Sequence, residues 1–159
     1  MTEQQLAIKL WHRSIIALFA LLGPAGMSLM VRLPEIKELL GVSTSELGLL
    51  LFSGAVGSIC ALTITGRVVS RFGTKPAMLF GFNAIAIGLI GQTLGAINQS
   101  SMTFGIMIFV TGFGYGLADV AINLDGSTIE TKLARSVLPR MHAAYSVGAL
   151  AGAAIGTIC

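Results

Sequence analysis

Five long apolar segments run through this sequence, separated by short polar stretches. We place them at 14–33, 47–65, 76–97, 102–124 and 141–159. A helix of roughly 20 mainly apolar residues crosses the roughly 30 Å of hydrocarbon in a bilayer. The sequence therefore predicts an all-α membrane protein with five transmembrane helices, after a short N-terminal segment, 1–13. The last segment is still apolar at its end, so we expect a partial bundle whose fifth helix is truncated.

The composition excludes several other classes of protein. Only 11% of the residues are charged and 54% are hydrophobic, whereas soluble domains carry about 25% charged residues. The ten Lys and Arg residues are scattered, which does not suit nucleic-acid binding. Cys60 and Cys159 both lie in apolar segments, and no metal, phosphate or nucleophile motif is present. We therefore expect no metal, no cofactor and no enzymatic activity.

The positive charges predict the orientation of the chain. The N-terminal segment and every second connection after it hold eight Lys or Arg residues: Lys9, Arg13, Arg67, Arg71, Lys75, Lys132, Arg135 and Arg140. The connections between these hold only Arg32 and Lys37. Because cytoplasmic loops carry an excess of positive charge, this bias predicts a cytoplasmic N-terminus.

Proline and glycine positions predict local features. Pro34 closes the first segment, and Pro24 lies inside it, where it should kink the helix or free a carbonyl group. Glycines recur every four residues at 112 and 116, and again at 148, 152 and 156. Such spacing favours close packing between membrane helices.

Asp119 is the candidate functional residue of the fourth segment. A charge at such a depth costs at least about 2.5–3.5 kcal/mol, so these residues usually face a bundle interior or a water-filled cavity. Asn123 follows four residues later and shares the same helix face. We expect Asp119 to bind a proton or a substrate, with Asn123 hydrogen-bonding beside it. The alternative is a structural carboxylate whose partners lie on neighbouring helices.

Three polar residues near the predicted cytoplasmic end of the bundle allow two interpretations. Asp125 and Glu130 follow the fourth segment, and His142 opens the fifth. Glu130 and His142 could form a gate, in which the histidine responds to pH. Asp125 and Glu130 could equally belong to a solvated loop, and His142 could be an ordinary interfacial histidine.

The connection 66–75 reads Gly-Arg-Val-Val-Ser-Arg-Phe-Gly-Thr-Lys. It resembles the loop signature of the major facilitator superfamily (MFS), although the positive-inside rule alone would also favour such a loop. The matching residues are Gly66, Arg71, Gly73 and Lys75, and Ser70 stands where the family usually has Asp. In that family the glycines allow close approach of helices, and the charges latch the cytoplasmic side.

Three further stretches, 32–36, 116–123 and 142–148, resemble a little-characterised bacterial inner-membrane branch of the same superfamily. More distantly, the chain resembles fucose:proton symporters, but their acidic residue late in the first helix has no equivalent in 28–31. The resemblance implies the N-terminal part of a bundle of twelve helices in two halves. A substrate would bind between the halves, which rock to give alternating access.

We therefore expect a secondary active transporter of a small solute, with proton coupling as an option. Its partners would be the bilayer of the inner membrane, the solute, a proton and the missing C-terminal half. The alternative is a non-transporting membrane protein, such as a sensor, an assembly subunit or the product of an inactive gene fragment.

Overall fold

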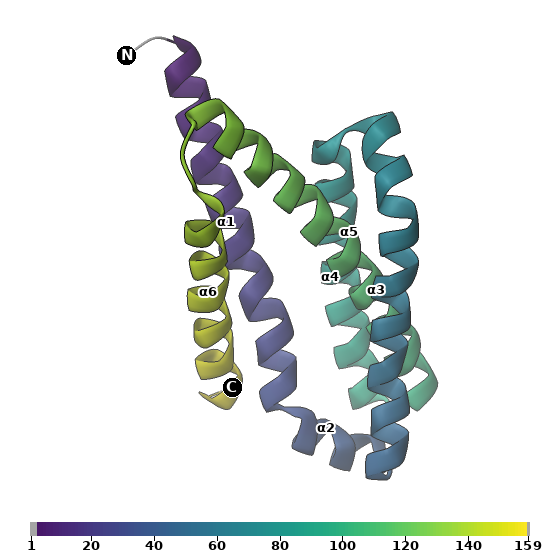
Figure 1. The fold of residues 1–159 in the computed structure, drawn as a ribbon. Helices are drawn as coiled ribbons and strands as arrows, with labels where there is room; N and C mark the ends of the chain where they lie inside the picture. Colours follow the sequence, from purple (N-terminus) through teal and green to yellow (C-terminus); the bar gives the residue numbers. More distant parts are fainter. Residues whose placement is uncertain (1–2, 159) are drawn as a thin grey trace. The chain divides into compact units, whose positions relative to one another are not determined.

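The chain is built from α-helices. The computed structural model describes residues 3–158, and no strand occurs among them. The helices are α1 (Glu3–Val31), α2 (Leu33–Leu40), α3 (Thr44–Phe72), α4 (Thr74–Ile97), α5 (Ser101–Leu133) and α6 (Leu138–Ile158), all labelled in Figure 1. The all-α prediction is confirmed.

All of these helices except α2 are long and apolar enough to cross a membrane. Large apolar side chains are exposed along them, for example Leu49 at 70%, Ile90 at 63% and Leu150 at 73%. Exposed apolar side chains on helices of this length suit lipid rather than water as their surroundings. The prediction of an all-α membrane protein with five apolar helices is confirmed.

Several helices extend beyond the apolar segments that predicted them. α1 begins at Glu3, well before residue 14, and α5 continues to Leu133, well past residue 124. The thickness of the hydrocarbon sets the length of an apolar segment, but a helix can continue into polar surroundings. The end of the predicted fifth segment, residue 159, lies outside the described residues, and the division into 1–13 and 14–159 stays a prediction.

α2 is the helix that the apolar pattern missed, and it changes the role of Pro34. Pro34 stands in the first turn of α2 and so opens a helix, besides following the end of α1. A proline is tolerated there because the first turn needs no N–H donor. Gly41 ends α2 with φ +63°, and its N–H donates to the carbonyl of Glu38 at 3.1 Å. With eight residues, α2 is too short to span a membrane.

The chain divides into two compact units. The first unit contains α1, the end of α5 from Ile122 and α6. The second unit contains α2, α3, α4 and α5 up to Ala121. Helix α5 is continuous and contributes to both units.

In the first unit, α1 and α6 lie side by side and glycines bring them into close contact (Figure 1). A β-carbon on Gly148 would collide with the carbonyl oxygen of Ala20, and one on Gly152 would collide with the backbone of Pro24. Because proline has no N–H, Pro24 leaves the carbonyl four residues earlier, that of Ala20, without its usual helical donor. The freed carbonyl therefore lies where α6 comes closest, and the predicted small-residue face of α6 is confirmed.

In the second unit, α3 packs closely on α5. A β-carbon on Gly112 would collide with the backbone of Gly54, and one on Gly116 would meet the carbonyl oxygen of Ser58 at 2.8 Å. The hydroxyl group of Ser58 also donates to the carbonyl oxygen of Gly112 at 2.8 Å. The predicted small-residue face of α5 is confirmed, with a polar contact beside it.

α4 packs on another side of α5 in the same unit. A β-carbon on Gly114 would meet the carbonyl oxygen of Gly81 at 2.6 Å. The amide group of Gln92, which is 2% exposed, donates to the hydroxyl group of Thr111 at 2.6 Å. Interhelical hydrogen bonds of this kind hold membrane helices together where no hydrophobic driving force exists between them. Helix α5 thus packs against both α3 and α4 in the part that precedes Asp119.

Candidate functional site

Asp119 lies deep within α5. Fourteen residues follow it before the helix ends at Leu133, which is about 21 Å of helix at 1.5 Å per residue, and the distance to Ser101 is about 27 Å. The side chain of Asp119 is exposed, and that of Asn123 is half-buried. Because α5 is a continuous α-helix through both positions, the spacing of four residues gives them the same helix face.

The connection between α3 and α4 is a single residue, Gly73. Its φ of +86° and ψ of 172° belong to a region that only glycine populates readily. Its N–H donates to the carbonyl oxygen of Val69 at 2.8 Å and so closes α3. Gly73 therefore makes the tight turn between two long helices, and a β-carbon there would strain the backbone.

The other loop-signature residues lie around this turn with few contacts. Gly66 is exposed on α3, and a β-carbon there would meet no atom within 4 Å among the described residues. Arg71 and Lys75 are exposed, and the guanidinium group of Arg71 lies 5.4 Å from the centre of the Phe72 ring. The hydroxyl group of Ser70 donates to the carbonyl oxygen of Arg67 on its own helix. Neither Arg71 nor Lys75 forms an ion pair with a carboxylate among residues 3–158.

Glu130 and His142, the two residues of the predicted gate, have separate partners. One carboxylate oxygen of Glu130 accepts hydrogen bonds from the N–H groups of Val137 at 2.7 Å and Leu138 at 3.0 Å. Glu130 therefore satisfies N–H groups at the start of α6, where a helix has no internal acceptors. The ring of His142 instead packs edge-on against Phe19, with centroids 5.1 Å apart.

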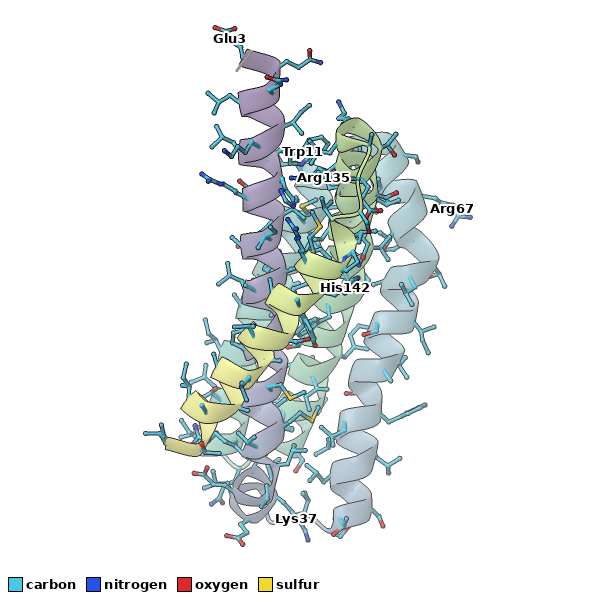
Figure 2. The ribbon with its side chains drawn as sticks, turned by 60° about the vertical axis from the view of Figure 1, so that its left-hand side comes forward. Glu3, Trp11, Lys37, Arg67, Arg135 and His142 are labelled. Atoms are coloured by element: carbon cyan, nitrogen blue, oxygen red, sulfur yellow. The ribbon has the colours of Figure 1, made fainter. Side chains whose placement is uncertain are left out.

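A hydrogen bond that no local sequence pattern indicates joins α1 to the end of α5. The indole N–H of Trp11 donates to Oδ2 of Asp125 at 2.8 Å, and Asp125 is only 9% exposed. The ammonium group of Lys132 lies 5.7 Å from the centre of the Trp11 ring. Asp125 is therefore a buried anchor, and its interpretation as part of a solvated loop is wrong. Figure 2 labels Trp11 at this end of the first unit.

Beside Trp11, His12 is buried at 8% exposure, and its Nε2 atom has no hydrogen-bond partner within residues 3–158. No cluster of three or more His, Cys, Asp or Glu side chains that could hold a metal ion occurs in the described part of the chain.

Similar curated proteins are bacterial transporters. An uncharacterised MFS-type transporter of Yersinia pestis is 29% identical over 120 residues, which cover 76% of this chain and 30% of the relative. An uncharacterised transporter of Sinorhizobium fredii is 31% identical over 132 residues, covering 80% of this chain and 33% of the relative. An uncharacterised MFS-type transporter of Bacillus subtilis is 33% identical over 92 residues, covering 58% of this chain and 20% of the relative.

The chain thus spans a third or less of the length of these relatives. No family model and no solved structure matches it. The similarity to MFS-type transporters extends over most of the chain, and the five long apolar helices agree with it. The chain is therefore similar to MFS-type transporters both in sequence and in its long apolar helices.

Proposed function

We propose that the chain is the N-terminal part of a secondary active transporter, which moves a small solute across a membrane by alternating access. The observation that carries the proposal is the carboxylate of Asp119 deep within an apolar helix, in a chain whose relatives are transporters. Because the chain spans at most a third of those relatives, a C-terminal half of the protein would complete the substrate site between two halves.

Asp119 is the proposed proton- or substrate-binding group, and Asn123 would hydrogen-bond beside it on the same face of α5. A carboxyl group is suited to this role because it changes charge when it binds a proton. The loop that holds Gly66, Arg71, Gly73 and Lys75 would act on the balance between the inward and outward states. Ser70, which can hydrogen-bond but carries no charge, would make a charge latch there weaker than in relatives with Asp.

The proposed location is the inner membrane, with the N-terminus in the cytoplasm. Lys9 and Arg13 at the start of α1 lie at the same end of the first unit as Lys132 and Arg135, as the Trp11 contacts require. In the second unit, the turn at Gly73 separates α3 from α4. Single cysteines at positions 74 and 99, in a protein without its native cysteines, should react with impermeant reagents from opposite sides. Reaction from the same side would contradict the proposed topology.

Transport itself is tested with the full-length protein in sealed vesicles. A panel of sugars, organic acids and amphiphilic cations is offered with and without an imposed pH gradient. We expect at least one solute to accumulate, with protein-free vesicles and vesicles that hold heat-denatured protein as controls. If no solute is exchanged or accumulated, and the protein instead changes the activity of a co-purified partner, the non-transporting alternative replaces this proposal.

A further inference from the structure

Tyr115 adds a phenol group to the part of α5 that precedes Asp119. It lies four residues before Asp119 and eight before Asn123. Because α5 is a continuous α-helix from Ser101 to Leu133, side chains at this spacing follow one another along one face. The side chain of Asp119 is exposed, and those of Tyr115 and Asn123 are half-buried. We call Tyr115, Asp119 and Asn123 the polar face of α5.

The close contacts of α5 with its neighbours lie on either side of the polar face. α3 approaches α5 at Gly112 and Gly116, and α4 approaches it at Gly114 and Ala118. Successive residues of an α-helix are about 100° apart around its axis, so the first two residues of the polar face fall between these two strips of small residues. The polar face is therefore separate from the surfaces through which α5 packs closely on α3 and α4.

The charge of the apolar helix segments limits the chemistry of a solute that binds there. No Lys or Arg occurs in 14–31, 44–66, 76–97, 101–131 or 141–158. A solute with a carboxylate or phosphate group would need a cation beside it, because an unpaired buried charge is costly. Once Asp119 is protonated, the polar face carries a phenol, a carboxyl and an amide group and no net charge. All three groups donate and accept hydrogen bonds, as the hydroxyl groups of a solute do.

We propose that Tyr115 contacts the transported solute, and that this solute is uncharged and bears hydroxyl groups. The ring of Tyr115 would pack against the C–H groups of the solute, and its hydroxyl group would form a hydrogen bond that fixes the orientation of the solute. This inference rests on the proposed transport function and assigns two roles within the polar face: Asp119 binds the proton and Tyr115 binds the solute. The other half of the protein would supply the opposite wall of the site.

The solute class is tested with the full-length protein in sealed vesicles, by exchange of labelled solutes without a pH gradient. The uncharged probes are glucose, myo-inositol and uridine, and their charged counterparts are gluconate, glucosamine and uridine monophosphate. Exchange of an uncharged probe should exceed that of its charged counterparts at least about tenfold, because a charge there has no counter-charge. If only a charged probe, an organic acid or an amphiphilic cation is moved, this inference is wrong and the transport proposal stands. If no solute is moved, both are wrong.

The role of Tyr115 is tested with the uncharged probe that is exchanged fastest. Tyr115→Phe keeps the ring and should raise the KM of exchange about fivefold, the effect of one lost hydrogen bond. Tyr115→Leu loses the ring as well and should raise the KM about 20-fold. Phe113→Leu is the matched control: it removes a ring two residues away, on another face of α5, and should leave the KM unchanged.

A second measurement separates solute binding from proton coupling. At saturating solute, the accumulation that a given pH gradient drives should be the same in the wild type and in both Tyr115 variants, because Asp119 is intact. Equal rises of the KM in Tyr115→Leu and Phe113→Leu would mean that the ring acts through packing, and would overturn the role of Tyr115. An unchanged KM in Tyr115→Phe and Tyr115→Leu would overturn it too. Tyr115→Phe differs from the wild type by one oxygen atom, so it provides the test if Tyr115→Leu does not fold.

Discussion

Replacing Asp119 by asparagine is expected to abolish pH-driven accumulation of the transported solute, down to the level of protein-free vesicles. Asparagine has nearly the same shape and can hydrogen-bond, but it cannot gain or lose a proton. A charged carboxylate at the centre of a membrane helix costs at least about 2.5–3.5 kcal/mol. Protonation or pairing of the carboxylate removes this cost. If proton binding at Asp119 drives the conformational change of the transporter, the pH gradient can no longer drive accumulation of the solute in the variant.

The design of this experiment distinguishes coupling from binding. Exchange of labelled solute in the absence of a pH gradient should continue in Asp119→Asn, because exchange needs no net movement of protons. Asp119→Glu keeps a titratable group on the same face of α5 and serves as the matched control, with partial accumulation expected. Unchanged accumulation in Asp119→Asn would assign Asp119 to a structural role. Loss of both exchange and accumulation in Asp119→Asn would point to substrate binding instead.

The sequence was sufficient for the large features of the fold because hydrophobicity and glycine spacing act locally. An apolar run of the length of a bilayer predicts a helix whatever surrounds it. The glycines at 148 and 152 predicted a close helix contact, but not that the partner would be Pro24. Partner choice depends on which helices meet in space, and a periodic pattern on a single helix does not carry that information.

The features that escaped prediction depend on contacts between distant parts of the chain. α2 was missed because eight residues are too few for the apolar pattern, and because Pro34 can end a segment or begin the next one. Trp11 and Asp125 are 114 residues apart, and neither position shows any local sign of the other. The hydrogen bonds that Glu130 accepts from Val137 and Leu138 depend on how the chain turns into α6, which the local sequence around Glu130 does not show.

The residues of the candidate site also fall into those that the sequence predicts and those that it does not. Asp119 and Asn123 could be chosen from the sequence because an acidic residue in an apolar helix is costly by itself, and their spacing fixes a shared face. The burial of His12 could not be predicted, since it results from α1 packing against the α5–α6 end of the first unit.

Gly152→Ala is expected to destabilise the protein, although alanine is the better helix former. A β-carbon at this position would collide with the backbone of Pro24, and backbone atoms cannot move aside as a flexible side chain can. Forcing extra volume into such a contact costs about 1–3 kcal/mol, more than the roughly 1 kcal/mol that alanine gains over glycine in helix propensity. The midpoint of thermal unfolding, measured in detergent by fluorescence-detected size exclusion, should therefore fall.

Gly66→Ala is the matched control, because it makes the same change in a helix at a position with no atom within 4 Å in the described chain. Only the propensity term acts there, so its unfolding midpoint should stay level or rise. The two variants together isolate the α1–α6 contact from the intrinsic effect of alanine. A fall of equal size in both would mean that glycine is required for helix flexibility and not for close packing. If Gly152→Ala were instead as stable as the wild type, α1 and α6 would have to separate easily around Pro24.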